Sequence, residues 1–283
     1  MTRSDRPDRR EERLLRGPRR IVCLTEETTE ALYAMGEEDR IVGISTFTRR
    51  PPRAAREKPK VSQFIRADVE AIRALEPDLV LAFSDLQADI CAELIRAGLE
   101  VYAFNQRSVA GAIEMVRILG RLIDERAKGE ALASGYERGL DEVRARAATL
   151  PRRPRVYFEE WPEPIITGIR WVAELVEIAG GVDCFPELRE KPLAADRIVD
   201  PAEVVARAPD LYLASWCGKR FSPEEARARP GFAAAPFTVD ERMREIDSLI
   251  ILAPGPAALT DGVAALETEI RRAAALPPAG GGA

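Results

Sequence analysis

The chain contains no histidine among its 283 residues, and this absence excludes several kinds of functional site. Zinc sites built on imidazole, Ser-His-Asp and Cys-His catalytic arrangements and imidazole ligation of haem iron all require that side chain. No two of the four cysteines form a C-x-x-C pair, so zinc-ribbon and thioredoxin-type sites are not indicated. We expect buried free thiols and no metal site at these positions, which are Cys23, Cys91, Cys184 and Cys217.

Long apolar runs are also missing, because no stretch of 18 consecutive apolar residues occurs, and a transmembrane segment is therefore not expected. The first twenty residues contain eight arginines and four acidic residues. The rest of the chain has 34 basic and 43 acidic residues, an acidic balance that does not favour nucleic-acid binding. Residues 1–19 are predicted to be a disordered arginine-rich arm.

That arm has no apolar core of the kind that a signal peptide needs. The sequence as written therefore predicts a cytoplasmic protein, and free cysteines are compatible with a reducing compartment. A periplasmic or cell-surface location is the alternative, if the chain naturally starts further upstream.

Short β-branched runs alternate with helical segments over residues 20–107, which predicts an N-terminal α/β lobe with a mostly parallel sheet. The strands are expected at 20–24, 40–45, 78–83 and 99–104. Residues 108–150 form a helical connector without proline, and its second helix is predicted to run from about Arg126 to Thr149.

The alternation resumes after the connector and predicts a C-terminal α/β lobe over residues 151–276. Strands are expected at 155–160, 210–216 and 245–252. A disordered tail is predicted for residues 277–283.

Two segments of the chain read alike, residues 67–85 and residues 200–218. Each consists of a short acidic helix, a Pro-Asp stop and an apolar strand, and Glu70 aligns with Glu203 in this repeat. Such internal similarity predicts two lobes with one plan. In open α/β sheets ligands bind beyond the carboxyl ends of the strands, so a ligand cleft between the lobes is expected.

Three segments resemble the substrate-binding proteins of ABC importers for cobalamin and ferric siderophores. They are RIVCLTEETTEALYAMGEEDRIVGIS, EAIRALEPDLVLAF and YFEEWPEPIITGIRWVAELVEIAGG, and the last is similar to a segment of proteins labelled cobalamin-binding. The resemblance covers roughly residues 19–275. It implies two Rossmann-like lobes joined by a single long backbone helix, and a protein that is not an enzyme.

The resemblance implies capture of a large chelate for an ABC importer, most simply cobalamin or a related corrinoid. Three loops differ from the family's pattern, at residues 46–52, 216–221 and 253–257. A ferric-siderophore or haem-like chelate therefore stays open, as does a cytosolic sensor or enzyme on the same scaffold. No phosphate loop, nucleophile elbow or dinucleotide fingerprint supports an enzyme, and no cofactor is expected.

In this family one glutamate on each lobe docks onto arginines of the transporter. By the repeat alignment these positions are Glu70 and Glu203. A permease is thus an expected partner.

Candidate ligand contacts are polar or aromatic residues near strand ends. Amides can bind an amide-rich ligand without the cost of burying a charge, and exposed aromatic side chains offer a flat surface to a planar one. Glu159 and Glu160 are adjacent on a strand and point to opposite faces, so they cannot act as a catalytic pair. The predicted contacts are Thr25, Phe47, Phe64, Phe83, Ser84, Gln87, Asn105, Gln106, Glu159, Glu160, Trp161, Arg170, Trp216 and Lys219.

Overall fold

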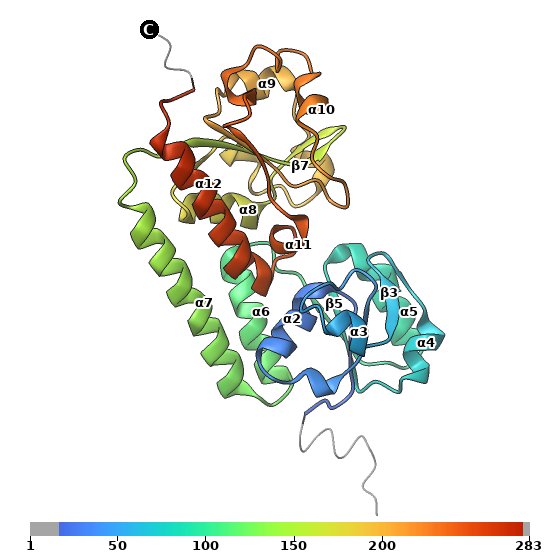
Figure 1. The fold of residues 1–283 in the computed structure, drawn as a ribbon. Helices are drawn as coiled ribbons and strands as arrows, with labels where there is room; N and C mark the ends of the chain where they lie inside the picture. Colours follow the sequence, from blue (N-terminus) through green and yellow to red (C-terminus); the bar gives the residue numbers. More distant parts are fainter. Residues whose placement is uncertain (1–16, 280–283) are drawn as a thin grey trace, which may run out of the picture. The chain divides into compact units, whose positions relative to one another are not determined.

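The computed structural model describes residues 17–279. These residues divide into two compact units. The first extends to Gln106 and includes Ala110–Gly135, and the second consists of Arg107–Val109 and the residues from Tyr136 onward. The predicted disorder of residues 1–16 and 280–283 lies outside the described residues. Figure 1 shows the elements of both units.

The first unit is built on a six-stranded sheet with the order β4-β3-β2-β1-β5-β6. All neighbouring strands are parallel except β4, which runs antiparallel to β3 at the edge. Val22 of β1 and Val80 of β5 lie in one core cluster with side chains of α4 and α5, among them Leu94 of α5. The strands are β1 (Ile21–Cys23), β2 (Ile41–Ser45), β3 (Lys60–Gln63), β4 (Arg66–Ala67), β5 (Leu79–Phe83) and β6 (Val101–Phe104).

The helices of the first unit connect these parallel strands, as the predicted β-α alternation requires. They are α2 (Glu26–Ala34), α3 (Ala54–Glu57), α4 (Val69–Ala74) and α5 (Ala88–Arg96). Helix α6 (Val109–Leu122) comes after β6, and all of it except Val109 belongs to the first unit. The predicted strands at 20–24, 40–45, 78–83 and 99–104 are confirmed with shorter bounds. The short elements α3, β3 and β4 were not among the predicted elements.

The second unit is built on a sheet with the order β11-β10-β7-β8, and β9 also pairs with β7. The strands are β7 (Arg155–Pro162), β8 (Ile165–Thr167), β9 (Val182–Asp183), β10 (Leu211–Ala214) and β11 (Met243–Glu245). The helices are α8 (Arg170–Ile178), α9 (Pro201–Ala206), α10 (Pro223–Arg227), α11 (Ser248–Ile251) and α12 (Val263–Ala275).

The predicted strand at 245–252 is wrong over most of its length. The pairing of β11 with β10 ends at Glu245, opposite Ala214. Asp247 then accepts a hydrogen bond from the backbone N–H of Leu249 and caps α11. The apolar run that followed was therefore a short helix, which periodicity alone does not distinguish from a buried strand.

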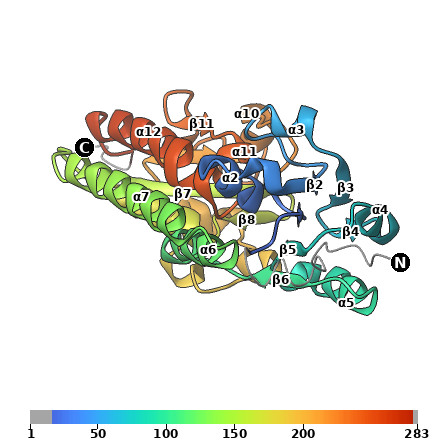
Figure 2. The ribbon, with the colours of Figure 1, turned by 90° about the horizontal axis from the view of Figure 1, so that it is seen from below.

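The predicted long helix is present as α7 (Arg126–Ala147), which at about 1.5 Å per residue is about 33 Å long. Residues up to Gly135 belong to the first unit and those from Tyr136 to the second. In the first unit α7 packs against α6 where Gly120 meets Gly129, since a Cβ atom on Gly120 would lie 2.7 Å from the Cα of Gly129. In the second unit Arg146 of α7 pairs with Glu267 of α12 at 2.7 Å, and the two helices lie side by side in both views (Figures 1 and 2).

The internal repeat is confirmed at the level of individual contacts. Asp68 caps α4 and Asp200 caps α9, each through a hydrogen bond from a backbone N–H of the first turn. After each helix one residue other than glycine adopts a positive φ, Glu76 at 45° and Ala208 at 46°. These equivalent positions are all 132 residues apart.

The same spacing relates the acceptor residues in the contacts that anchor the two central strands. Asp78 accepts a hydrogen bond from the backbone N–H of Arg20 at 2.8 Å, and Asp210 accepts one from that of Arg155 at 2.9 Å. The guanidinium groups of Arg20 and Arg155 donate to the carbonyls of Leu75 and Arg207, which are again 132 residues apart. In both units one aspartate carboxylate thus joins the end of a helix to the sheet.

Both ends of the described chain form hydrogen bonds with the rest of their unit. Arg40 donates to the carbonyl of Pro18, and the backbone N–H of Ala279 donates to Asp210 at 2.8 Å. The predicted disorder is therefore wrong for residues 17–19 and 277–279. Across the described residues, none of the helices combines the length and the apolar character that crossing a membrane would take.

Candidate functional site

The first unit presents apolar side chains to solvent beyond the carboxyl ends of its parallel strands. Phe47 follows β2 and is 49% exposed, Ile65 follows β3 and is 63% exposed, and Leu86 follows β5 and is 50% exposed. All three follow strands of the parallel sheet at their carboxyl ends, where open α/β sheets bind ligands. Phe64, beside Ile65, is half-buried.

Gln87 holds two of these loops together. Its side-chain amide donates to the carbonyl of Phe64 at 2.7 Å and accepts from the backbone N–H of Phe83 at 3.0 Å. The side chain is buried, so the amide predicted to contact ligand is engaged in positioning the loops after β3 and β5.

The other predicted residues of the first unit divide by exposure. Asn105 is exposed at the end of β6. Ser84 is buried with a φ of 64°, and its hydroxyl accepts from the backbone N–H of Leu86 at 3.3 Å. Thr25, Phe83 and Gln106 are buried. Accessible predicted contacts in this unit are therefore Phe47, Phe64 and Asn105.

Sequence reasoning missed a buried carboxyl group in the first turn of α2. The Glu27 side chain is buried, and its Oε1 atom has no hydrogen-bond partner among the described residues. Burial, reinforced by the nearby carboxylates of Glu26 and Glu30, raises the pKa of Glu27 to about 8. At neutral pH this carboxyl is therefore mostly uncharged.

In the second unit the candidate site surrounds a buried ion pair. Glu159 of β7 is fully buried and accepts from both terminal nitrogens of Arg229, at 2.6 and 2.9 Å. It also accepts from the Tyr157 hydroxyl at 2.5 Å and from the Trp216 indole at 2.8 Å. The charge is thus satisfied by partners from three parts of the chain.

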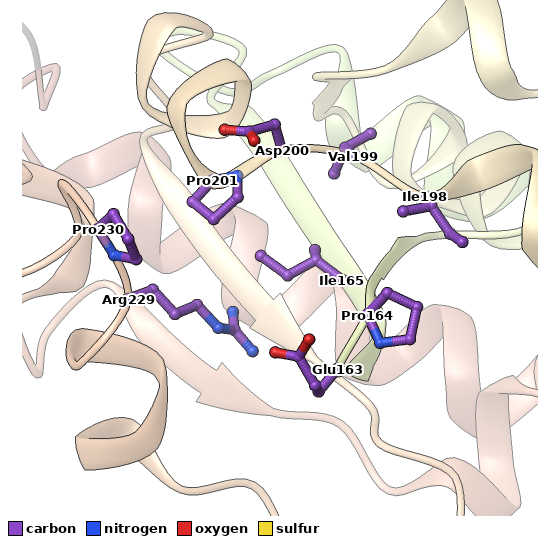
Figure 3. A pocket seen from close by; sticks show the side chains of 9 residues that line it. All are labelled: Glu163, Pro164, Ile165, Ile198, Val199, Asp200, Pro201, Arg229 and Pro230. Carbon is purple, nitrogen blue, oxygen red and sulfur yellow. The ribbon is translucent and has the colours of Figure 1, made fainter.

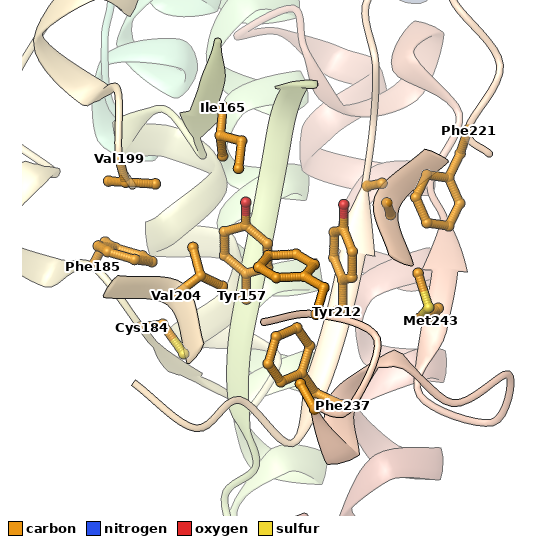
Figure 4. Packing of buried hydrophobic residues seen from close by; sticks show 14 of the residues in the cluster. Tyr157, Ile165, Cys184, Phe185, Val199, Val204, Tyr212, Phe221, Phe237 and Met243 are labelled. Atoms are coloured by element: carbon orange, nitrogen blue, oxygen red, sulfur yellow. The ribbon is translucent and has the colours of Figure 1, made fainter. Parts of the chain in front are cut away.

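An aromatic cluster encloses this ion pair. The rings of Tyr157 and Tyr212 lie 4.9 Å apart on neighbouring strands, and Figure 4 shows their hydroxyl groups pointing the same way. Burial, together with the negative charge of Glu159, raises the pKa of both tyrosines well above the usual value. The hydroxyls therefore remain protonated.

Two of the predicted ligand contacts are buried among the described residues. Trp216 is only 2% exposed, because its N–H is needed by Glu159 and its ring packs edge-on against Phe221 at 5.1 Å. Glu159 is the buried acceptor itself. The position of Trp216 after a strand predicted an exposed aromatic ring, but its hydrogen bond to the buried Glu159 carboxylate places the ring in the core.

The remaining predicted residues of this unit reach the surface. Trp161 is half-buried and donates its indole N–H to the carbonyl of Glu163 at 2.8 Å. Arg170 pairs with Glu174 at 2.8 Å. Lys219 pairs with Glu225 at 2.7 Å.

Glu160 is oriented by a residue that the sequence did not single out. Arg197 is almost completely buried, and it donates to Glu160 at 2.7 Å and to the carbonyl of Thr167. Because a buried guanidinium needs a counter-charge, Arg197 holds the half-buried carboxylate of Glu160 in position. Arg197 lies 37 residues from Glu160, so no local pattern marked the pair.

The two predicted docking glutamates are both exposed and both lie in first helical turns. Glu70 pairs with Arg73 at 3.1 Å, and Glu203 pairs with Arg207 at 2.8 Å. Their caps, Asp68 and Asp200, show that Glu70 is the second helical residue and Glu203 the third. The predicted alignment of these two glutamates is therefore wrong by one position, or about 100° around a helix axis.

No disulfide joins the four cysteines, all of which lie within the described residues, and Cys23 and Cys184 are buried, Cys91 half-buried and Cys217 exposed. Exposure of Cys217 differs from the expected burial. Within residues 17–279 no group of three or more acidic or cysteine side chains is arranged to hold a metal ion.

Two α/β units, each built on its own sheet, define the class of fold, and comparison with known proteins gives the family. Residues 21–248 match the family described as periplasmic binding proteins. Since the match covers most of the chain, this chain belongs to the periplasmic binding protein family. The family and its solved relatives are binding proteins, which confirms the resemblance and the prediction that the chain is not an enzyme.

Two curated relatives are named for a corrinoid. A cobalamin-binding protein of Halobacterium salinarum is 29% identical over 203 residues, 66% of this chain and 53% of the relative. A vitamin B12-binding protein of Vibrio vulnificus is 29% identical over 169 residues, 59% of this chain and 61% of the relative. The chain therefore spans between half and two thirds of the length of these relatives.

Solved structures establish the fold. The periplasmic vitamin B12-binding protein of Vibrio cholerae matches with a TM-score of 0.72 and 22% identity, covering 92% of this chain and 99% of that one. The periplasmic haem-binding protein BhuT matches with a TM-score of 0.76 and 24% identity, covering 90% and 99%. The predicted fold class is thereby confirmed.

We predict that Glu159→Gln destabilises the protein by about 3–5 kcal/mol, because it leaves the Arg229 charge buried without its counter-charge. Urea unfolding followed by circular dichroism measures the change. Glu190→Gln, which removes an exposed partner of Arg170, is the matched control and should cost at most about 1 kcal/mol. A loss below about 1 kcal/mol for Glu159→Gln would show that the pair is not structurally essential.

The raised pKa of Glu27 predicts that the stability of the protein depends on pH in the opposite direction to that expected for a salt-bridged acid. Its pKa is raised from 4.5 to about 8 on folding, so the folded chain binds more protons between these values and stability falls as pH rises. Glu27→Gln should therefore gain stability over the wild type between about pH 5 and pH 9. Melting temperatures of both proteins, with Glu70→Gln as an exposed control, test this, and parallel pH curves for Glu27→Gln and wild type would contradict it.

Proposed function

We propose that this chain captures a large chelate, cobalamin or a related corrinoid, and delivers it to an ABC importer. The observation that carries the proposal is the group of exposed apolar side chains beyond the carboxyl ends of β2, β3 and β5. Phe47, Ile65 and Leu86 offer an apolar surface where α/β sheets bind ligands. The names of the corrinoid-binding relatives support the same ligand class.

The absence of histidine favours a corrinoid over haem among the chelates. A chelate whose metal is already fully coordinated needs no ligand atom from the protein, whereas haem iron is commonly held by an imidazole. A haem-like or ferric chelate remains the second candidate, supported by the fold shared with BhuT. Arg49, Arg50, Arg170, Lys219 and Arg220 would then supply positive charge to an anionic ligand.

The proposed contacts are the predicted residues that the structure leaves accessible. Phe47, Phe64 and Asn105 lie on the first unit, and Glu160 and Trp161 on the second. The placement of the ligand between the lobes remains a prediction. Ligand contact by Arg170 and Lys219 also remains a prediction, and both of these charges are already paired with glutamates.

Titration of cyanocobalamin is predicted to quench tryptophan fluorescence with a micromolar or tighter dissociation constant, because Trp161 lies among the proposed contacts. Phe47→Ala should weaken binding by about 1–2 kcal/mol through lost apolar contact. Ile95→Ala removes a similarly exposed side chain from α5 and is the control, with no expected effect. Haemin is titrated in parallel, and saturable binding of haemin without cobalamin binding would overturn the corrinoid assignment.

We further propose that Glu70 and Glu203 dock onto a permease, which requires the protein to work outside the cytoplasmic membrane. The family description and the periplasmic relatives support this location over the cytoplasmic expectation. Each glutamate is exposed in the first turn of its helix, and each has an arginine of its own that a partner's cation would displace.

Charge reversal tests the docking proposal. Glu70→Arg and Glu203→Arg should reduce uptake of labelled chelate by native cells several-fold while leaving the affinity of the purified protein unchanged. Glu93→Arg, at an exposed position of α5, is the matched control. Normal uptake by both variants, or recovery of the protein only in the cytoplasmic fraction, would contradict the docking role.

A further inference from the structure

The second unit contains a pocket that none of the proposed chelate contacts lines. Its volume is about 380 Å³, at the lower end of the roughly 300–1,000 Å³ of small-molecule sites. It lies between the turn that joins β7 to β8, the segment that leads into α9, and the loop after α10 (Figure 3). The lining residues are Glu163, Pro164, Ile165, Ile198, Val199, Asp200, Pro201, Arg229 and Pro230.

Six of the nine lining residues are apolar side chains or proline rings, and the fold holds them in place. Val199 donates its backbone N–H to the carbonyl of Ile165 at 3.1 Å, and Ile198 pairs with Ile166 of β8. Three proline rings complete the wall, and proline fixes its own backbone φ. The pocket therefore exists before any ligand binds, which lowers the entropic cost of binding.

Arg229 lies at one end of the pocket, but its hydrogen-bonding capacity is almost spent. One terminal nitrogen donates to Glu159 and to the Tyr212 hydroxyl at 3.2 Å. The other donates to Glu159 and to the carbonyl of Pro162 at 3.1 Å. Since a guanidinium has five N–H donors, only the Nε–H remains, and a bidentate contact to an anionic ligand is excluded.

The remaining charged groups of the pocket are carboxylates. Glu163 turns toward the middle of the pocket beside Arg229, and Asp200 lies at the opposite end (Figure 3). Asp200 uses one oxygen to cap α9, through the backbone N–H of Ala202 at 2.8 Å. With Glu159 balancing Arg229, the two rim carboxylates give the pocket a net negative charge.

We propose that this pocket binds an organic cation, a guanidinium or primary ammonium group on a short apolar stem. The cationic group pairs with Glu163, the stem contacts Ile165, Ile198 and the prolines, and Asp200 adds negative charge at the opposite end of the pocket. Glu163 and Asp200 are both exposed, so added salt should screen their attraction for the cation. The site does not depend on the chelate, and its test is independent of chelate binding.

The test uses n-butylguanidinium as the probe and N-butylurea as its neutral analogue of the same shape. Calorimetry should show millimolar or tighter binding of the cation, no binding of the urea, and weakening as salt is raised. In methyl NMR spectra the signals of Ile165 and Ile198 should shift on titration. No saturable binding of the cation, or equal binding of the urea, would overturn the proposal.

Two conservative variants locate the cation. Glu163→Gln and Asp200→Asn should each weaken cation binding at least about threefold. Asparagine is as good a helix cap as aspartate, so Asp200→Asn keeps α9 intact. Glu241→Gln, which removes an exposed charge outside the pocket, is the control and should bind the cation normally. Unchanged cation binding in both pocket variants, with melting temperatures equal to wild type, would contradict the assignment. If a variant fails to fold, the salt dependence of cation binding by the wild type is the test, and binding that does not weaken as salt is raised would contradict the proposal.

Discussion

The buried ion pair between Glu159 and Arg229 determines how the second unit presents its surface. A carboxylate placed inside a sheet must have its charge and lone pairs satisfied, and here Arg229, Tyr157 and Trp216 satisfy them. The same arginine reaches the carbonyl of Pro162 and so fixes the end of β7. Because successive strand residues point to opposite faces, burial of Glu159 directs Glu160 to the other face.

This arrangement also defines what the pocket beside Arg229 is able to bind. An arginine near a cavity usually suggests an anion, but this guanidinium has been committed to Glu159, Tyr212 and Pro162. What remains for a ligand is the negative charge of Glu163 and Asp200. The interaction that stabilises the unit thus reverses the charge preference of the pocket next to it.

The two units share the contacts that anchor their central strands and differ beyond the carboxyl ends of those strands. Asp78 and Asp210 anchor the central strands in the same way, which shows that the repeat preserves the contacts on which the sheet depends. Beyond the strands the first unit exposes apolar side chains, whereas the second presents paired charges and a pocket with an acidic rim. Function is therefore expected to reside in the loops, which are free to differ.

Much of the fold could be predicted from the sequence because the signals are local. The proline-free stretch gave α7, and the repeated acid-helix-Pro-Asp pattern located α4 with β5 and α9 with β10. The site was harder, because its contacts join distant residues. Nothing near Trp216 indicated that a carboxylate 57 residues away would bury its indole. The raised pKa of Glu27 likewise depends on packing that no periodicity reveals.

The most direct test of the account is to identify what the protein carries in its own cell. Protein purified from the native host without added ligand is examined by its absorbance spectrum and by mass spectrometry of the released small molecules. We predict a corrinoid, with visible absorption bands and a cobalt-containing mass, in a substantial fraction of molecules. Recovery of a haem, a ferric siderophore or a ligand without a metal would contradict the central claim.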